Sequence, residues 1–114
     1  MPKVYIPSAG HNDFTIAKQF GDLEFILPQG QSHFRISAII KIIEERLLDI
    51  KQKDYLIMVG TNVVVSICLI EWLKKLGSCN MLIYHSKLNK YIKRKVKFDD
   101  KGIREIYLSF NIFI

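Results

Sequence analysis

The sequence predicts a small three-layer α/β domain of Rossmann-like type, with a mostly parallel sheet and a C-terminal antiparallel β-hairpin. Two observations support this fold class. Residues 55–86 read as an apolar strand, a polar turn, an apolar helix and a second strand, and a helical crossover makes the two strands parallel. Beyond residue 86 the apolar period changes to two, which is typical of paired strands. Because the chain has 114 residues, we expect a single domain, 1–114.

The N-terminal segment predicts a short strand and a short helix. Apolar residues dominate Lys3 to Ile6, which indicates the strand. The helix is expected at about residues 13–20, where Asn12 or Asp13 can cap its first turn and Gly21 can end it.

A second strand and a long helix follow. The strand is expected at residues 23–27, and Ser32 is a good N-cap for a helix that continues to about Ile50. Helical spacing joins one set of apolar residues in this segment: Phe34, Ile36, Ile39, Ile40, Ile43, Leu47 and Ile50.

The second half predicts a buried strand at residues 55–59 and a helix that begins after Gly60. This helix has almost no polar face, so we expect it to be nearly surrounded by protein or to lie at an oligomer interface. The C-terminal hairpin should pair residues 91–98 with residues 106–112 around a turn at residues 99–102.

Composition and cysteine usage favour a soluble cytoplasmic protein. Seventeen basic and eleven acidic residues give a net charge of +6, which favours anionic partners where the charge is clustered. Cys68 and Cys79 do not form a metal-type pair, and the N-terminus has no apolar signal segment. The uncharged run of residues 55–70 is too short to cross a bilayer, so we expect no membrane association.

Several segments together resemble a known group of proteins. They are the opening KVYIPSAGHNDFTIAKQFGDLEFI, the segment DYLIMVG with the apolar helix after it, and LGSCNMLIYHSKLNKYIKRKV. This pattern is similar to that of a loose group of short, uncharacterised proteins encoded by phages and related mobile elements, up to about Phe98. The resemblance implies a protein that acts in the cytoplasm of an infected cell, on host machinery or on nucleic acid.

A ligand site is predicted where the parallel strands end, because ligands of open parallel sheets bind beyond the carboxyl ends of the strands. We expect a non-enzymatic module that binds a phosphorylated small molecule or nucleotide, with no catalytic residue, metal or cofactor. The glycines allow close backbone approach to an anion at a helix N-terminus, although helix capping by Ser32 and Asn62 explains the same loops. The candidate residues are Ser8, Gly10, His11, Asn12, Gly30, Gln31, Ser32, Gly60, Thr61, Asn62 and His85.

A strongly basic strand is a second candidate surface. Alternation places Tyr91 and three of the lysines on one face, where they can contact the phosphates of a nucleic acid. A lysine-rich strand at the edge of a sheet also prevents edge-to-edge aggregation, and both interpretations remain open. The residues concerned are Lys90, Tyr91, Lys93, Lys95 and Lys97.

The third hypothesis is a protein-interaction domain that inhibits a host complex or forms a homodimer. The apolar helix after Gly60 and the C-terminal sequence SFNIFI supply the apolar surface that such contacts need.

Overall fold

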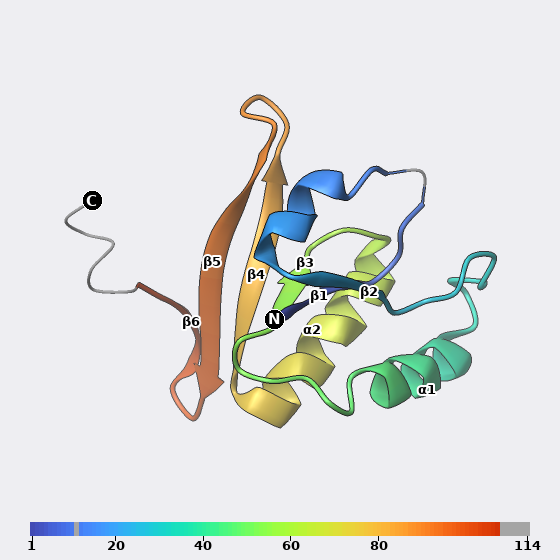
Figure 1. The fold of residues 1–114 in the computed structure, drawn as a ribbon. Coiled ribbons are helices and arrows are strands. Elements are labelled where there is room, and N and C mark those ends of the chain that lie inside the picture. Colours follow the sequence, from blue (N-terminus) through green and yellow to red (C-terminus); the bar gives the residue numbers. More distant parts are fainter. Residues whose placement is uncertain (11, 108–114) are drawn as a thin grey trace.

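The computed structural model describes residues 1–10 and 12–107, which contain one six-stranded sheet (Figure 1). The strand order is β2-β1-β3-β4-β5-β6. The strands are β1 (Lys3–Ile6), β2 (Asp22–Phe25), β3 (Tyr55–Ile57), β4 (Ser78–His85), β5 (Lys90–Asp99) and β6 (Gly102–Ile106). The helices are the 3-10 helix η1 (Thr15–Phe20), α1 (Ile36–Arg46) and α2 (Asn62–Leu76).

The sheet is mixed, so the α/β class is confirmed and the expectation of a mostly parallel sheet is wrong. Strands β2, β1, β3 and β4 run parallel, whereas β4 pairs antiparallel with β5, and β5 antiparallel with β6. The longest ladder is antiparallel and includes every residue of β4 from Ser78 to His85. The parallel ladders are short because β3 has only 3 residues, while β4 continues beyond it to pair with β5.

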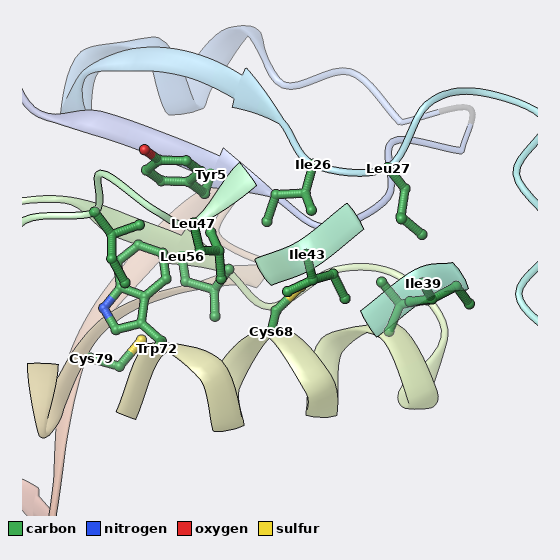
Figure 2. Close-up of a cluster of buried hydrophobic side chains, with 12 residues drawn as sticks. Tyr5, Ile26, Leu27, Ile39, Ile43, Leu47, Leu56, Cys68, Trp72 and Cys79 are labelled. Carbon is green, nitrogen blue, oxygen red and sulfur yellow. The ribbon is translucent and has the colours of Figure 1, made fainter. Parts of the chain in front are cut away.

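Helices cover both faces of the parallel strands. The main core lies between these strands and the helices α1 and α2, and Figure 2 shows its side chains converging. Tyr5 of β1 meets Trp72 of α2 edge to face, with ring centroids 5.5 Å apart, a geometry that aromatic pairs favour. A second core lies under η1, where Phe14 and Ala17 pack with Ile57 and Leu82 of the sheet.

Helix α1 begins later than the sequence predicts. Its N-cap is Arg35, which makes no side-chain capping bond. The Ser32 hydroxyl instead accepts the backbone N–H of Phe34 at 3.3 Å, so the expected N-cap closes a turn ahead of the helix. Phe34 is therefore not part of the buried helical face but 94% exposed, whereas Ile39 and Ile43 are buried as predicted.

Helix α2 agrees with the prediction in its boundaries; of its two predicted surroundings, near-complete burial within the chain is wrong and an oligomer interface stays a prediction. The helix ends at Gly77, whose left-handed conformation (φ 73°) lets its N–H reach the carbonyl of Leu73 at 2.8 Å. Val63 and Ile70 are 43% and 65% exposed, so protein does not surround the helix within the described residues of this chain. Across residues 1–10 and 12–107, no helix combines the length and hydropathy needed to span a membrane.

The C-terminal part contains two consecutive hairpins, β4–β5 and β5–β6. The predicted turn at residues 99–102 is correct, since Asp99 and Gly102 form the last pair of the second hairpin. The second arm of the hairpin is predicted at residues 106–112. This predicted start is wrong, because β6 already runs from Gly102 to Ile106. Residues 108–112 lie outside the described residues.

Candidate functional site

Three of the four loops after the parallel strands meet. The Nδ1 atom of His33, in the loop after β2, forms a 3.0 Å hydrogen bond with the hydroxyl of Thr61, in the loop after β3. Gly60 lies against the loop after β1, since a Cβ atom added to it would stand 3.2 Å from the Cβ of Ser8. The sequence therefore predicts correctly that these loops lie together.

An open groove runs along the outer side of β2, beside two of these loops. We call it the β2-edge groove; its volume is about 820 Å³. It is lined by residues 8–10, by residues 23–25 of β2, by residues 27–31, by His33 and by Arg46. Four of the predicted ligand residues are among them: Ser8, Gly10, Gly30 and Gln31.

Three side chains give the groove its chemistry, and the sequence prediction missed all of them. Arg46 comes from the last turn of α1 and Glu24 from the middle of β2. Phe25 is 45% exposed, and its ring packs edge to face against Phe14, with centroids 6.0 Å apart. None of them lies in a loop after a strand, since Phe25 is the last residue of β2, so the strand-end rule gave no signal for these side chains.

The predicted anion cradle at Gly60–Asn62 does not line this groove. Thr61 is the N-cap of α2, with an extended backbone and no side-chain capping bond, and Asn62 is the first helical residue. The capping interpretation of Asn62 is therefore wrong. The Thr61 hydroxyl is engaged by His33, and anion binding at this helix N-terminus remains a prediction.

Two further predicted residues lie elsewhere, and His11 is outside the described residues. The amide of Asn12 donates to the carbonyl of Ala9 at 3.1 Å, and Asn12 lines a separate cavity of about 490 Å³ beside Tyr84 and Tyr91. His85 pairs with Lys90 near the tip of the β4–β5 hairpin. In the part of the chain that the structure describes, no three His, Cys, Asp or Glu residues form a potential metal site.

The basic strand β5 is an interior strand only in its C-terminal half, where Lys95 to Asp99 pair with β6, whereas Lys90 to Arg94 pair with β4 alone among the described residues. The interpretation as protection of a sheet edge is therefore wrong for Lys95 and Lys97, and it stays open for Lys90 and Lys93. Cross-strand pairing of Lys93 with the buried Leu82 places Lys93 on the face that carries η1. Tyr91, Lys95 and Lys97 share that face by alternation, whereas Lys90 lies on the opposite one.

Neither cysteine is suited to nucleophilic chemistry. Cys68 and Cys79 are buried and free, and burial raises the pKa of each thiol to about 12. For Cys79, the neighbouring Cys68 raises the pKa further. Both thiols are protonated and packed in the main core at neutral pH.

Comparison with known proteins gives one match. Residues 2–98, from the start of the chain nearly to the end of β5, match the model of a family described as phage Pam3 gp32-like protein. The chain belongs to this family, which confirms the resemblance to short phage-encoded proteins. No curated protein and no solved structure matches the chain.

Proposed function

We propose that this phage Pam3 gp32-like protein is a non-enzymatic binding module that takes a nucleotide, or a similar phosphorylated small molecule, in the β2-edge groove. The observation that supports it most is the combination of a guanidinium, a carboxylate and an exposed aromatic ring in one groove of about 820 Å³. Pockets that hold small ligands have volumes of roughly 300–1,000 Å³, so a nucleotide fits by size.

Arg46 is the group best suited to the phosphate. Its planar guanidinium can donate two parallel hydrogen bonds to phosphate oxygens. Within residues 1–10 and 12–107, Arg46 forms no ion pair, so its donors are available to a ligand. His33 lines the same groove.

Glu24 and Phe25 are suited to the remainder of a nucleotide. A carboxylate accepts hydrogen bonds from ribose hydroxyls, as the acidic residue of dinucleotide-binding folds does. The half-exposed ring of Phe25, held in place by Phe14, offers an apolar surface for a base. These two groups favour a nucleotide over inorganic phosphate.

The loops allow the backbone to approach the ligand closely. Gly10 and Gly30 have positive φ angles of 56° and 87°, and nothing lies within 4 Å of a Cβ atom added to Gly30. Backbone N–H groups in such conformations form concave sites for anions. This backbone geometry therefore also supports a phosphorylated ligand.

We also propose that the module acts in the cytoplasm of an infected cell. Membership in a phage protein family and two free, buried cysteines support this compartment. We further propose that the fold is Rossmann-like. This description fits a domain that binds its ligand beyond the ends of the parallel strands. A homodimer or a host protein partner, which the exposed Val63 and Ile70 of α2 favour, is compatible with it.

Titration calorimetry tests this function with a panel of nucleoside mono-, di- and triphosphates, the parent nucleosides and inorganic phosphate. We expect a phosphorylated nucleoside to bind and to stabilise the protein by about 2.7 kcal/mol at a hundred times its dissociation constant. The variant Arg46→Gln should bind it roughly tenfold to a hundredfold more weakly, as expected for loss of a hydrogen bond to a charged group.

Arg35→Gln is the matched control, because Arg35 is exposed at the other end of α1 and does not line the groove. This variant should bind as the unmodified protein does. If no ligand of the panel binds, or if both variants bind equally well, the proposal is wrong.

A further inference from the structure

The face of the sheet that carries η1 continues beyond this helix onto the two long strands β4 and β5. Cross-strand pairing places Tyr84 opposite Tyr91 there. Lys93 and Lys95 follow on β5 opposite the buried Leu82 and the half-buried Asn80. We call the residues Phe20, Tyr55, Tyr84, Tyr91, Lys93 and Lys95 the lysine–aromatic face.

Aromatic rings form a continuous row on this face. The ring centroids of Tyr84 and Tyr91 lie 5.3 Å apart, those of Tyr91 and Phe20 6.4 Å, and those of Phe20 and Tyr55 5.7 Å. Tyr84 at the end of the row is 48% exposed. The packed row holds its rings in fixed orientations, and the exposed Tyr84 gives a base a ring on which to stack.

Positive charge accompanies the row. The ammonium group of Lys93 lies 5.9 Å from the ring centroid of Phe20 and 5.8 Å from that of Tyr55. Lys53 and Lys95 line the same open groove of about 510 Å³ as Lys93. In the described part of the chain neither Lys93 nor Lys95 forms an ion pair, whereas Lys97 lies 3.9 Å from Asp99.

Core packing and protection of a sheet edge explain this arrangement only in part. Because β6 pairs with Lys95 to Asp99, Lys95 does not protect a sheet edge, and the ammonium group of Lys93 lies over two rings on the sheet face. From Tyr91 to Lys97 the strand extends for about 20 Å at 3.3 Å per residue, so rings and ammonium groups are spaced along a path. A linear polyanion with flat rings complements such a path, because its phosphates meet the lysines and its bases meet the aromatic side chains.

We infer that the lysine–aromatic face binds single-stranded nucleic acid. The bases contact Tyr84 and Tyr91, and the phosphates contact Lys93, Lys95 and Lys53. Stacking on an open sheet face requires bases that are not paired, which favours a single strand over a duplex. Binding is expected to be largely independent of sequence, because every base has a face on which a ring can stack.

Fluorescence anisotropy tests this inference with oligonucleotides of about 12 nucleotides, a length within the range of single-strand sites. The probes are single-stranded DNA, single-stranded RNA and duplex DNA of the same sequence, and polyglutamate represents an acidic protein partner. We expect the single strands to bind more tightly than the duplex and than polyglutamate. Comparison of the DNA and RNA probes identifies the preferred backbone.

Salt dependence reports the phosphate contacts. Each contact with a single strand contributes a slope of about 0.7 in a plot of log affinity against log salt concentration. Changing both Lys93 and Lys95 to Gln should therefore reduce the slope by about 1.4. The matched control changes Lys41 and Lys75 to Gln, two exposed lysines on α1 and α2, and should leave the slope nearly unchanged.

Stacking is tested separately, because Tyr84→Ala removes an exposed ring without changing the charge. The affinity should fall roughly 5- to 150-fold with the salt slope preserved, and Tyr84→Phe should restore it. Lys95→Gln alone, which leaves the Lys93 ring contacts intact, serves if the double variant loses its fold. Arg46→Gln should not alter this binding, so the outcome is independent of the proposed nucleotide site.

Three outcomes would overturn the inference. One is equal affinity for the duplex and the single strands. Another is an equal loss of slope in the control variant. The third is a preference for polyglutamate, which would assign the face to an acidic protein.

Discussion

The carboxylate of Asp54 accepts the backbone N–H of Lys3 with a distance of 2.8 Å, and this bond joins the turn before β3 to the start of β1. Its other oxygen accepts the N–H of Lys51 at 2.9 Å. The side chain of Asn80 donates to the Asp54 carbonyl at 3.1 Å and so ties β4 to the same point. Asp54 is 3% exposed, and these bonds compensate for its burial.

Asp54→Ala should lower the free energy of unfolding by about 1–3 kcal/mol, because it leaves two N–H groups in partly buried positions without their acceptor. Urea denaturation followed by circular dichroism measures this change. Asp49→Ala is the control, because Asp49 is exposed and makes no hydrogen bond that the described residues record. A loss as large in the control would show that the effect is one of net charge.

Trp72→Ala should destabilise the protein by about 3–5 kcal/mol, since it leaves a large cavity beside Tyr5 in the main core. Ile70→Ala on the same helix removes a side chain that is 65% exposed and should change the stability by less than about 0.5 kcal/mol. Urea denaturation of both variants makes the comparison. A large loss for Ile70→Ala would instead indicate that this side of α2 is covered in solution.

The buried thiols make stability depend on pH in the alkaline range. Burial raises the pKa of Cys68 and Cys79 from 9.0 to about 12, so the unfolded chain loses these protons first. The stabilising contribution is therefore complete below about pH 9 and is lost as the pH rises toward about 12. Burial likewise raises the pKa of Tyr5, from 10.0 to about 12, with the same sign.

Denaturation at a series of pH values should thus show a free energy of unfolding that declines above pH 9. Replacement of both cysteines by Ala should make this decline shallower, with the remainder due to tyrosines whose pKa is also raised, Tyr5 foremost. Alkylation of native protein by iodoacetamide at neutral pH should be slow and should accelerate on unfolding. Rapid alkylation of the native protein would mean that the main core opens readily.

Gly21 permits a close backbone contact that no other residue allows. A Cβ atom added to it would stand 2.1 Å from the carbonyl oxygen of Pro2, the oxygen that accepts the N–H of Asp22 at 3.0 Å. Gly21→Ala should therefore separate the start of β2 from β1. At Gly102, with φ 98°, a Cβ atom would meet nothing within 4 Å, so only backbone strain opposes Ala there.

We expect Gly21→Ala to destabilise the protein by at least about 1 kcal/mol more than Gly102→Ala. Thermal unfolding of the two variants under one condition decides this. Equal losses would show that the chain near Pro2 can shift at little cost.

The sequence predicts the strands and helices well where the apolar pattern is clear, as in the continuous apolar run of α2 and the alternation of β5, and less well where turn chemistry decides. Ser32 has the chemistry of an N-cap, yet its hydroxyl closes a turn and α1 begins at Ile36. The sequence analysis did not predict the β4–β5 hairpin, because its turn at residues 87–89 contains no glycine. Asn89 itself adopts the positive φ of 47° that such a turn requires.

The site was predictable only in part for a related reason. The strand-end rule identifies loops, and the loops with Ser8, Gly30 and Thr61 do lie together. Arg46 reaches the groove from the far end of α1, and this requires the packing direction of the helix, which no local pattern encodes. The shared face of the β5 lysines was predictable from alternation alone, whereas the contact of Lys93 with the ring of Phe20 depends on how η1 crosses the sheet.

The strands of the sheet differ in how far apart along the chain they lie from the strands with which they pair. Strands β4, β5 and β6 are neighbours both in the sheet and in the sequence, so they can pair as soon as they are made. Strand β1 lies between β2 and β3. Its ladder with β3 pairs Val4 with Tyr55, about fifty residues later in the sequence, so this ladder forms only after Tyr55 has been synthesised. During synthesis the first strand therefore remains exposed on one side until the middle of the chain has emerged.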